Sequence, residues 1–547
     1  MRKFSSPLEA FEYWEEKTPQ AEFLRQNHHG KLNILTYGEA GVQARKVARF
    51  LLDQKFPEQS KIALLSKNSD FWVLADLAII MAGHVSVPIY PTLQDDSIRP
   101  IVEHSESVLV FAGKLDDFSG QKDAFGSMTI IGSEKYGTPS QTTWEQLVEH
   151  NEPATDLTYR DPQDLISIIY TSGTTGMPKG VMHSIENFAN ATYNLNYNLR
   201  LVSQPRFFSY LPLSHIAERI GIENHAFLTG ASLTFADTIE SFASDLESTQ
   251  PHLFFAVPRI WAKFQEKIRE GLPQKKLNIL LNIPILNSVL KKKIKQKLGL
   301  SKAAYIVSGA APLSVDLINW FKKLDIEILQ AYGMTEDCVI SHINLPGLNK
   351  IGSVGKTTHG AVAKLSSEGE ICVKNDSLML GYYKLPEETA EVFDRDGYLK
   401  TGDVGEYDHD GYLFITGRAK DQFKTDKGKY ISPAPIELKL SKNPDIGQVC
   451  LVGMGIPQPI MLVILSEEGQ KKTKELISES LLNSILQMNP ELEKHEKIEK
   501  AIVMKEDWTI ENGLLTPTLK IKRSRVEKIH MPMYKSWFES EDRVIFE

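Results

Sequence analysis

The segment LISIIYTSGTTGMPKGV, residues 165–181, is the most informative part of this sequence. Residues 165–169 are apolar except for one serine, which predicts a buried strand. Glycines at positions 173, 176 and 180 allow backbone amides to approach an anion closely. Hydroxyl donors and one cation accompany them: Thr171, Ser172, Gly173, Thr174, Thr175 and Lys179 make up the candidate loop. We predict a phosphate-binding loop after a buried strand.

This loop differs from the phosphate loop of P-loop nucleotide hydrolases. Pro178 stands five residues after Gly173, where that signature has glycine, and Gly180 follows Lys179, where it has serine or threonine. The P-loop class is therefore excluded. A glycine-rich turn without a ligand is the alternative interpretation, but the density of hydroxyl and cationic residues after a buried strand disfavours it.

The pattern on both sides of the loop indicates an α/β protein. Short apolar runs near residues 62–65, 108–111, 253–257 and 304–307 alternate with stretches of helical period, which predicts buried parallel strands. Past Gly369, short strands with Asp-Gly turns predict a small antiparallel layer. The chain of 547 residues is long enough for two or three domains. We place a boundary after Gly417, giving a large domain 1–417 with several subdomains and a small α+β domain 418–547.

Composition excludes several classes of function and location. The net charge of −8 argues against a nucleic-acid partner. The chain has three cysteines, without paired spacing, so neither a disulfide framework nor a cysteine zinc site is expected, and a cytoplasmic location fits best. The early glutamates argue against a signal peptide. The apolar stretch 71–90 is interrupted by polar residues and predicts a buried helix, a turn and a strand, not a membrane span.

Lysines cluster in residues 263–302, around an apolar run from Leu277 to Leu290. Such a segment can lie on the anionic inner face of a membrane, with its lysines near lipid phosphates and its apolar side chains in the interface. A solvated helix packed on the core fits the same composition. The sequence leaves both interpretations open.

The loop at 170–181 resembles the phosphate-loop signature of the adenylate-forming superfamily, which includes acyl-CoA synthetases, adenylation domains and luciferases. Further similar motifs follow in the family's order: LPLSHI at 211–216, SGAAPL at 308–313, AYGMTE at 331–336, YLKTGD at 398–403, GRAKD at 417–421 and a lysine motif near 520. The wording of residues 211–219 and 515–523 looks most like the long-chain fatty acyl-CoA synthetase branch.

The resemblance implies roles for residues of the large domain. Tyr332, with Gly333 beside it, would stack on adenine, Thr335 would contact the α-phosphate, and Glu336 would coordinate Mg²⁺. Gly309 and Ala310 would form the wall of the adenine site. His215 would lie near the entrance for the carboxylate substrate, and a purely structural histidine is the competing interpretation.

The resemblance also assigns residues around and beyond the boundary. Asp403 would accept the ribose hydroxyls, and Arg418 would lie near ribose and phosphate. Lys520 would enter the active site during adenylation, with Lys522 as the rival, since Leu519 occupies the place where many members have glycine. Lys420 would be the hinge on which a mobile C-terminal domain turns, and Gly428 would let the pantetheine arm of coenzyme A pass.

The resemblance implies an ATP-dependent long-chain fatty acid–CoA ligase that works through an acyl-adenylate. Its expected substrates are a fatty acid, ATP and coenzyme A, and Mg²⁺ is the expected cofactor. Two alternatives remain. The acyl group could pass to the thiol of a carrier protein instead of coenzyme A, or the chain could be a nucleotide- or lipid-binding relative without turnover.

Overall fold

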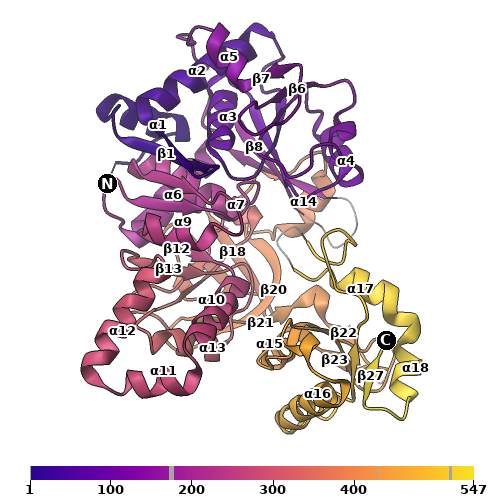
Figure 1. Ribbon diagram of the computed structural model, residues 1–547. Helices are drawn as coiled ribbons and strands as arrows, with labels where there is room; N and C mark the ends of the chain where they lie inside the picture. The colour runs from indigo at the N-terminus through magenta and orange to yellow at the C-terminus, as the bar shows by residue number, and fades with distance from the viewer. Residues whose placement is uncertain (1, 172–177, 427, 517–519) are drawn as a thin grey trace. The chain divides into compact units, whose positions relative to one another are not determined.

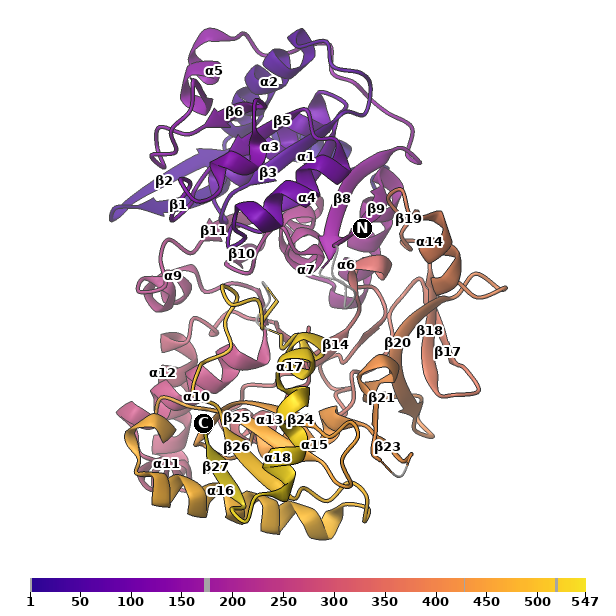
Figure 2. The same cartoon turned by 90° about the vertical axis from the view of Figure 1, so that its right-hand side faces the viewer.

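The computed structural model describes residues 2–171, 178–426, 428–516 and 520–547. It divides into two compact units, which are described separately. The first unit comprises Met1–Ala310, Leu317–Ala363 and Val373–Leu399, and the second comprises Ala311–Asp316, Lys364–Cys372 and Lys400–Glu547. Many of the helices and strands are labelled in Figure 1, and Figure 2 shows them from another side.

Within the described residues, the largest sheet has eight strands in the order β19-β9-β8-β4-β3-β5-β6-β7. Their bounds are β3 (Lys61–Leu65), β4 (Val85–Ile89), β5 (Leu109–Ala112), β6 (Thr129–Gly132), β7 (Thr142–Thr143), β8 (Leu165–Thr171), β9 (Lys179–Ser184) and β19 (Gly381–Tyr382). In this order, the six strands β8, β4, β3, β5, β6 and β7 each pair in parallel with the next. β9 is antiparallel to both of its neighbours, β8 and β19. The predicted strand at 165–169 is confirmed as the buried part of β8.

The apolar stretch at 71–90 also has the predicted form. It folds as α3 (Asp70–Met81), a turn and then β4. The side chain of Ser69 caps the N-terminus of α3. Every residue of α3 is buried, because the helix packs inside the main hydrophobic core. None of the helices in the described residues has the length and apolar composition needed to cross a bilayer.

Two further sheets belong to the first unit. One has the order β10-β11-β1-β2, with β1 (Glu22–His28), β2 (Lys31–Thr36), β10 (Arg206–Ser209) and β11 (Ser232–Phe235). The other has the order β12-β13-β14-β15-β16, with β12 (Leu253–Ala256), β13 (Tyr305–Ser308), β14 (Leu329–Tyr332), β15 (His342–Ile343) and β16 (Lys356–Thr357). β12, β13 and β14 are parallel, so their carboxyl ends lie at one edge.

Helices surround these sheets (Figures 1 and 2). In chain order they are α1 (Pro7–Lys17), α2 (Tyr37–Asp53), α4 (Asp95–Ser105), α5 (Trp144–His150), α6 (Ile185–Leu199), α7 (Ile216–Glu218), α8 (His225–Thr229), α9 (Phe242–Thr249), α10 (Pro258–Gly271), α11 (Gln274–Leu281), α12 (Pro284–Lys297), α13 (Val315–Lys322) and α14 (Pro386–Val392). A π-helical turn, Arg219–Asn224, joins α7 to α8.

The predicted antiparallel layer is confirmed. It is a sheet of order β17-β18-β20-β21, with β17 (Ala361–Leu365), β18 (Glu370–Asn375), β20 (Leu399–Tyr407) and β21 (Leu413–Arg418). β20 and β21 are antiparallel, and Asp403 lies opposite Arg418 in their register.

The C-terminal part has the predicted mixture of helices and strands. Its sheet has the order β24-β25-β26-β27, with β24 (Ile446–Val452), β25 (Ile460–Leu465), β26 (Lys500–Val503) and β27 (Val544–Phe546). Its other elements are the hairpin β22 (Phe423–Lys424) and β23 (Tyr430–Ile431), and the helices α15 (Pro433–Leu440), α16 (Lys474–Met488), α17 (Arg523–His530) and α18 (Tyr534–Glu539). Separate hydrophobic clusters stabilise this part.

Candidate functional site

The two ends of the predicted phosphate loop are held together by a strand pair. Thr171 ends β8 and Lys179 begins β9, and the two residues lie opposite each other in the antiparallel register. The hydroxyl of Thr171 donates a hydrogen bond to the carbonyl oxygen of Lys179 at 3.5 Å. Ser172, Gly173, Thr174 and Thr175 lie outside the described residues. The ends of the loop are thus fixed on the largest sheet.

One tyrosine connects this loop to the predicted metal ligand. Tyr382 in β19 lies beside β9, and the Lys179 ammonium lies 4.8 Å from the centroid of its ring. The phenol of Tyr382 donates a hydrogen bond to Oε1 of Glu336 at 2.8 Å. Burial, together with the negative charge of Glu336, raises the pKa of Tyr382, so the phenol remains a donor at neutral pH. A cation and a carboxylate 157 positions apart therefore meet at one aromatic ring.

Glu336 lies on a tightly folded turn that follows β14. Gly333 passes so close to Val339 that a Cβ atom on the glycine would lie 2.5 Å from the Val339 Cα atom. Cys338 and Val339 adopt left-handed backbone conformations, with φ of 52° and 57°. This conformation is strained for a β-branched residue, and strain of this kind is concentrated at functional sites.

The adenine-site candidates meet at the carboxyl edge of parallel strands. Gly309 and Ala310 follow β13, and Tyr332 ends the neighbouring strand β14. A Cβ atom on Gly309 would lie 3.0 Å from the carbonyl oxygen of Ala331. Ala310 adopts a left-handed conformation with φ of 66°. Ligands of α/β proteins bind at such edges, so this edge can hold a flat ring.

Glu336 fits a magnesium site of one particular kind. Within the described residues, no group of three or more His, Cys, Asp and Glu side chains could hold a metal ion. Magnesium in nucleotide sites needs only one or two carboxylates, because phosphate oxygens and water complete its shell. Glu336 is 8% exposed and lies next to the tyrosine that contacts Lys179. Its carboxylate has the chemistry and the position for that arrangement.

His215 has a local structural role. It is the N-cap of α7, and its Nδ1 atom accepts a hydrogen bond from the backbone N–H of Ala217 at 3.1 Å. This bond positions the imidazole near the end of the LPLSHI segment, at the start of α7. Its proposed position near the substrate carboxylate stays a prediction.

A buried ionic network follows His215 and was not predicted from the sequence. The Arg219 guanidinium donates hydrogen bonds to Asp76 at 2.5 Å, Glu223 at 3.3 Å and the Ser167 hydroxyl at 2.8 Å. Burial, and then the charge of Asp76, raises the pKa of Glu223, whereas the Arg219 guanidinium opposes this shift. The network joins α3, β8 and the π-helical turn. No local pattern reveals it, because its members are scattered along the chain.

Glu218 is a second buried acid, and it gives a prediction of pH dependence. Burial raises the pKa of Glu218 to about 8, although hydrogen bonds from the Ser209 hydroxyl and the Tyr210 amide oppose the shift. The folded state therefore binds this proton more tightly than the unfolded state does. Stability from Glu218 is greatest below the unfolded pKa of about 4.5 and falls as pH rises to about 8.

Replacing Glu218 with glutamine should remove this dependence. The amide oxygen can accept the same hydrogen bonds, so we expect wild type to lose about 1.4 kcal/mol of stability per pH unit, relative to Glu218→Gln, across that window. Thermal unfolding of both proteins at several pH values measures this difference, and other titrating groups cancel. Parallel pH curves would contradict the prediction.

The second unit brings three other predicted residues together. The Arg418 guanidinium donates a hydrogen bond to the Asp403 carboxylate at 2.7 Å. The charges of both groups act electrostatically on the ammonium of Lys520. Its pKa is lowered, by loss of hydration first and by the positive charge of Arg418 second, whereas Asp403 raises it. Asp403, Arg418 and Lys520 form one charged cluster within this unit.

Three further candidates lie elsewhere in the second unit. Lys420 is exposed in a 3₁₀ turn, Ala419–Asp421, which directly follows β21. Gly428 lies in the turn between β22 and β23, and its positive φ of 73° favours glycine there. Lys522, the rival of Lys520, is the N-cap residue of α17.

Tyr382 is the site residue that the sequence interpretation missed. It does not belong to any motif named above, and its role depends on the pairing of β19 with β9. The available signal was the tripeptide Gly381-Tyr382-Tyr383. A glycine within a strand can mark a close backbone approach, but it does not identify the partner segment.

Comparisons with known proteins identify the family. A family model described as AMP-binding enzyme matches residues 11–383, and a model of the AMP-binding enzyme C-terminal domain matches residues 420–532. Long-chain-fatty-acid–CoA ligase 5 of Rattus norvegicus is 29% identical, covering 92% of this chain and 84% of the relative. Long-chain-fatty-acid–CoA ligase FadD15 of Mycobacterium bovis is 28% identical, covering 90% of each chain.

Solved structures share the fold. The adenylation domain of a carboxylate reductase from Mycobacterium chelonae superposes with a TM-score of 0.81 at 21% identity, over 98% of this chain and 91% of that chain. The anthranilate CoA ligase AuaEII, in complex with anthranoyl-AMP, superposes with a TM-score of 0.77 at 19% identity, over 97% and 98%. The predicted α/β fold is thus that of known adenylate-forming structures.

Proposed function

Because the chain belongs to the AMP-binding enzyme family, we propose that it is an ATP-dependent long-chain fatty acid–CoA ligase. The family uses ATP, and the chain is an enzyme of this ligase family. The contact of Lys179 and Glu336 with Tyr382, at the end of the phosphate loop, carries the proposal. The names of the relatives support a long-chain substrate and coenzyme A as the acceptor.

The reaction would proceed in two steps. A carboxylate oxygen of the fatty acid attacks the α-phosphorus of ATP, and the bond to pyrophosphate breaks. The sulfur of coenzyme A, having lost its proton, then attacks the acyl carbonyl, and AMP leaves. Carboxylate alone is a poor acyl donor, and the mixed anhydride with AMP supplies a good leaving group. The protein contributes position and charge, and no nucleophilic side chain is needed.

We assign the roles in the first unit as follows. Lys179 and the loop 171–175 bind the phosphates, and Thr335 contacts the α-phosphate. Tyr332 stacks on adenine, beside Gly309, Ala310 and Gly333. Glu336 would hold Mg²⁺, which when bound would neutralise phosphate charge. His215 lies near the substrate carboxylate.

The second unit supplies the remaining groups of the proposal. Asp403 binds the ribose hydroxyls, with Arg418 holding its carboxylate in place, and Lys520 acts during adenylation. Lys420 is the proposed hinge between a domain of residues 1–417 and a mobile domain of residues 418–547. We propose that Gly428, which has no side chain, leaves room for the pantetheine arm of coenzyme A in the second step.

A thioester assay tests the function. The chain is mixed with ATP, Mg²⁺ and carboxylates from acetate to long-chain fatty acids, with either coenzyme A or a carrier protein bearing a pantetheine thiol. We expect the highest kcat/KM with long-chain acids and coenzyme A. Preference for the carrier thiol would establish the alternative acceptor. Absence of ATP–pyrophosphate exchange with every acid would establish a binding protein without turnover.

Location follows the proposed substrates. We propose that the chain acts in the cytoplasm and makes peripheral contact with the inner face of a membrane through residues 263–302. Fatty acids partition into bilayers because their chains are apolar, so a ligase for them gains from working at that surface.

The phenol of Tyr382 should matter for the use of magnesium and ATP. Tyr382→Phe removes the hydrogen bond to Glu336 and keeps the ring beside Lys179. A hydrogen bond to a charged group contributes about 1.5–3 kcal/mol, so we expect kcat/KM for Mg-ATP to fall about 10- to 100-fold. ATP–pyrophosphate exchange measures it.

Tyr383→Phe is the matched control for this variant. The hydroxyl of Tyr383 makes a long, exposed contact with Glu106 at 3.5 Å, so we expect little change. Equal losses in both variants, or no loss in Tyr382→Phe, would contradict the assignment.

A further inference from the structure

Helices α11 and α12 form a hairpin that is weakly attached to the rest of its unit. We call residues 274–297 the α11–α12 hairpin. Leu277 is the buried residue of α11, and none of the residues of α12 is buried, although the structure describes all of them. Helices in globular proteins are stabilised mainly by burying one apolar face. Leu290 and Ile294 of α12 are half-buried, so the hairpin packs on one side and leaves other apolar side chains exposed.

The exposed apolar side chains lie around the turn of the hairpin. Exposed fractions are 62% for Ile279, 42% for Ile283, 80% for Ile285, 45% for Leu286 and 61% for Val289. Ile285, Leu286 and Val289 share one side of α12, because their positions fall within about one third of the helical circle. A contiguous exposed patch of large aliphatic residues marks an interaction surface.

The charge around this patch has a single sign. Between Glu270 and Asp316 the sequence has no acidic residue and has eight lysines: Lys275, Lys276, Lys291, Lys292, Lys293, Lys295, Lys297 and Lys302. Helix α10 is different, because Glu266 and Glu270 lie among its basic residues. The stretch of sequence without acidic residues therefore begins at α11.

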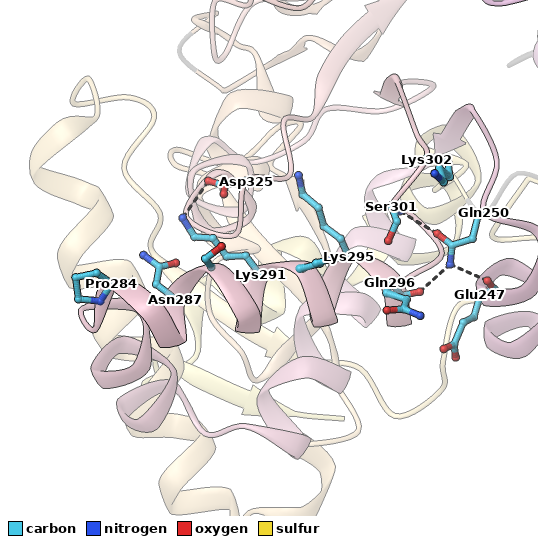
Figure 3. Close-up of a pocket in the computed structure, with 12 residues that line it drawn as sticks. Glu247, Gln250, Pro284, Asn287, Lys291, Lys295, Gln296, Ser301, Lys302 and Asp325 are labelled. Atoms are coloured by element: carbon cyan, nitrogen blue, oxygen red, sulfur yellow. Dashed lines mark hydrogen bonds and ion pairs between the residues drawn. The ribbon is translucent and has the colours of Figure 1, made fainter.

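Only part of this charge is neutralised within the unit. Lys291 pairs with Asp325 at 3.0 Å, and Lys297 pairs with Glu247 at 3.0 Å. Among the described residues, Lys275, Lys276, Lys292, Lys293 and Lys295 have no ion-pair partner. One side of α12 borders a cleft of about 850 Å³, toward which Lys291 and Lys295 project, with Lys302 at its far end (Figure 3). Glu247 and Asp325 also line this cleft and pair with Lys297 and Lys291, whereas Lys292, Lys295 and Lys302 line it without an ion-pair partner among the described residues.

We propose that the α11–α12 hairpin docks on an anionic lipid bilayer. The aliphatic side chains at the turn enter the interface, and the unpaired lysines contact lipid phosphates. Apolar residues at one tip with lysines along the same helices are the composition of interfacial helices. The absence of acidic residues over this stretch matches a negatively charged surface. The docking does not depend on the ligase activity proposed above.

Co-sedimentation with lipid vesicles tests the charge contribution. The probe is the full chain with vesicles of phosphatidylcholine, with or without phosphatidylglycerol. We expect binding to the mixed vesicles that weakens with added salt, and little binding to phosphatidylcholine alone. Lys292→Gln/Lys293→Gln/Lys295→Gln should weaken binding about 100-fold, since each lysine near an anionic surface contributes about five-fold.

A matched control removes as many exposed lysines elsewhere in the same unit. Lys31→Gln/Lys55→Gln/Lys122→Gln changes the net charge equally and should bind the vesicles nearly as wild type does. If both triple variants bound the vesicles equally weakly, net charge alone would explain the loss of binding, and the proposed docking site would be overturned. Failure of the unaltered chain to bind mixed vesicles would overturn it as well.

Insertion of the tip has its own readout. Ile285→Ser/Val289→Ser should weaken binding about 10-fold, and both side chains are exposed, so folding should be retained. In Ile285→Trp, the added indole should show a blue-shifted fluorescence increase on mixed vesicles, compared with wild type as the background. An unchanged spectrum with retained binding would overturn insertion of the tip. Thioester formation from a short, soluble acid separates these outcomes from failure of the proposed function.

Discussion

Replacing Lys520 with alanine should slow adenylate formation by about 10²- to 10³-fold, the usual effect of removing one charge that stabilises a transition state. The proposed role is to bring a positive charge between the carboxylate and the α-phosphate while they react. In its own unit, Lys520 shares a cluster with Asp403 and Arg418, which bear the proposed ribose contact. Thioester formation from supplied acyl-adenylate should proceed at nearly the wild-type rate, because the phosphate chemistry is already complete.

Two assays separate these steps. ATP–pyrophosphate exchange follows the first, and conversion of synthetic acyl-adenylate with coenzyme A follows the second. Lys522→Ala is the control, because Lys522 is the N-cap of α17 and the rival in register. A larger loss in Lys522→Ala would transfer the role to that residue. Equal loss of both steps in Lys520→Ala would argue against two poses of the C-terminal domain.

The second large effect is expected for Glu336→Gln. This change removes the negative charge and keeps Oε1 as the acceptor for the Tyr382 phenol, so the tightly folded turn should be retained. Magnesium would lose its only proposed protein carboxylate. We expect at least a 100-fold lower rate at limiting Mg²⁺ and a half-saturating Mg²⁺ concentration about 10-fold higher.

A magnesium titration of ATP–pyrophosphate exchange measures this effect. Glu387→Gln removes an exposed carboxylate from α14, close in sequence to Tyr382, and should leave the titration unchanged. Thermal unfolding of the two variants checks that the fold is intact. A Glu336→Gln enzyme with the magnesium dependence of wild type would exclude Glu336 as the ligand.

Local patterns were enough to predict the main elements. The strand at 165–169, the helix and strand at 71–90 and the antiparallel layer are confirmed, because hydrophobic period and Asp-Gly turns are encoded over a few residues. The resemblance gave Asp403 and Arg418 separate roles, and their mutual hydrogen bond is a finding of the structure. The boundary after Gly417 and the hinge at Lys420 stay predictions.

Contacts between distant segments could not be predicted in this way. The role of Tyr382 depends on the pairing of its strand with β9 and on its hydrogen bond to Glu336, and both partners lie far from it in the sequence. The Arg219 network joins three elements in the same manner. For the lysine-rich segment, composition left open a helix on a membrane surface and a solvated helix packed on the core. The absence of buried residues in α12 favours the membrane-surface interpretation.

The shortness of β19 has a consequence for local opening. A strand of two residues has too few hydrogen bonds to its neighbour to resist fraying. The Thr389 hydroxyl of α14 supports β19, because it accepts a hydrogen bond from the backbone N–H of Tyr382 at 2.8 Å. Loosening of α14 would therefore free the Tyr382 phenol from Glu336. Occupancy of the proposed nucleotide site should, in turn, slow deuterium uptake at the Tyr382 amide, because α14 and the proposed magnesium ligand Glu336 would share one opening equilibrium.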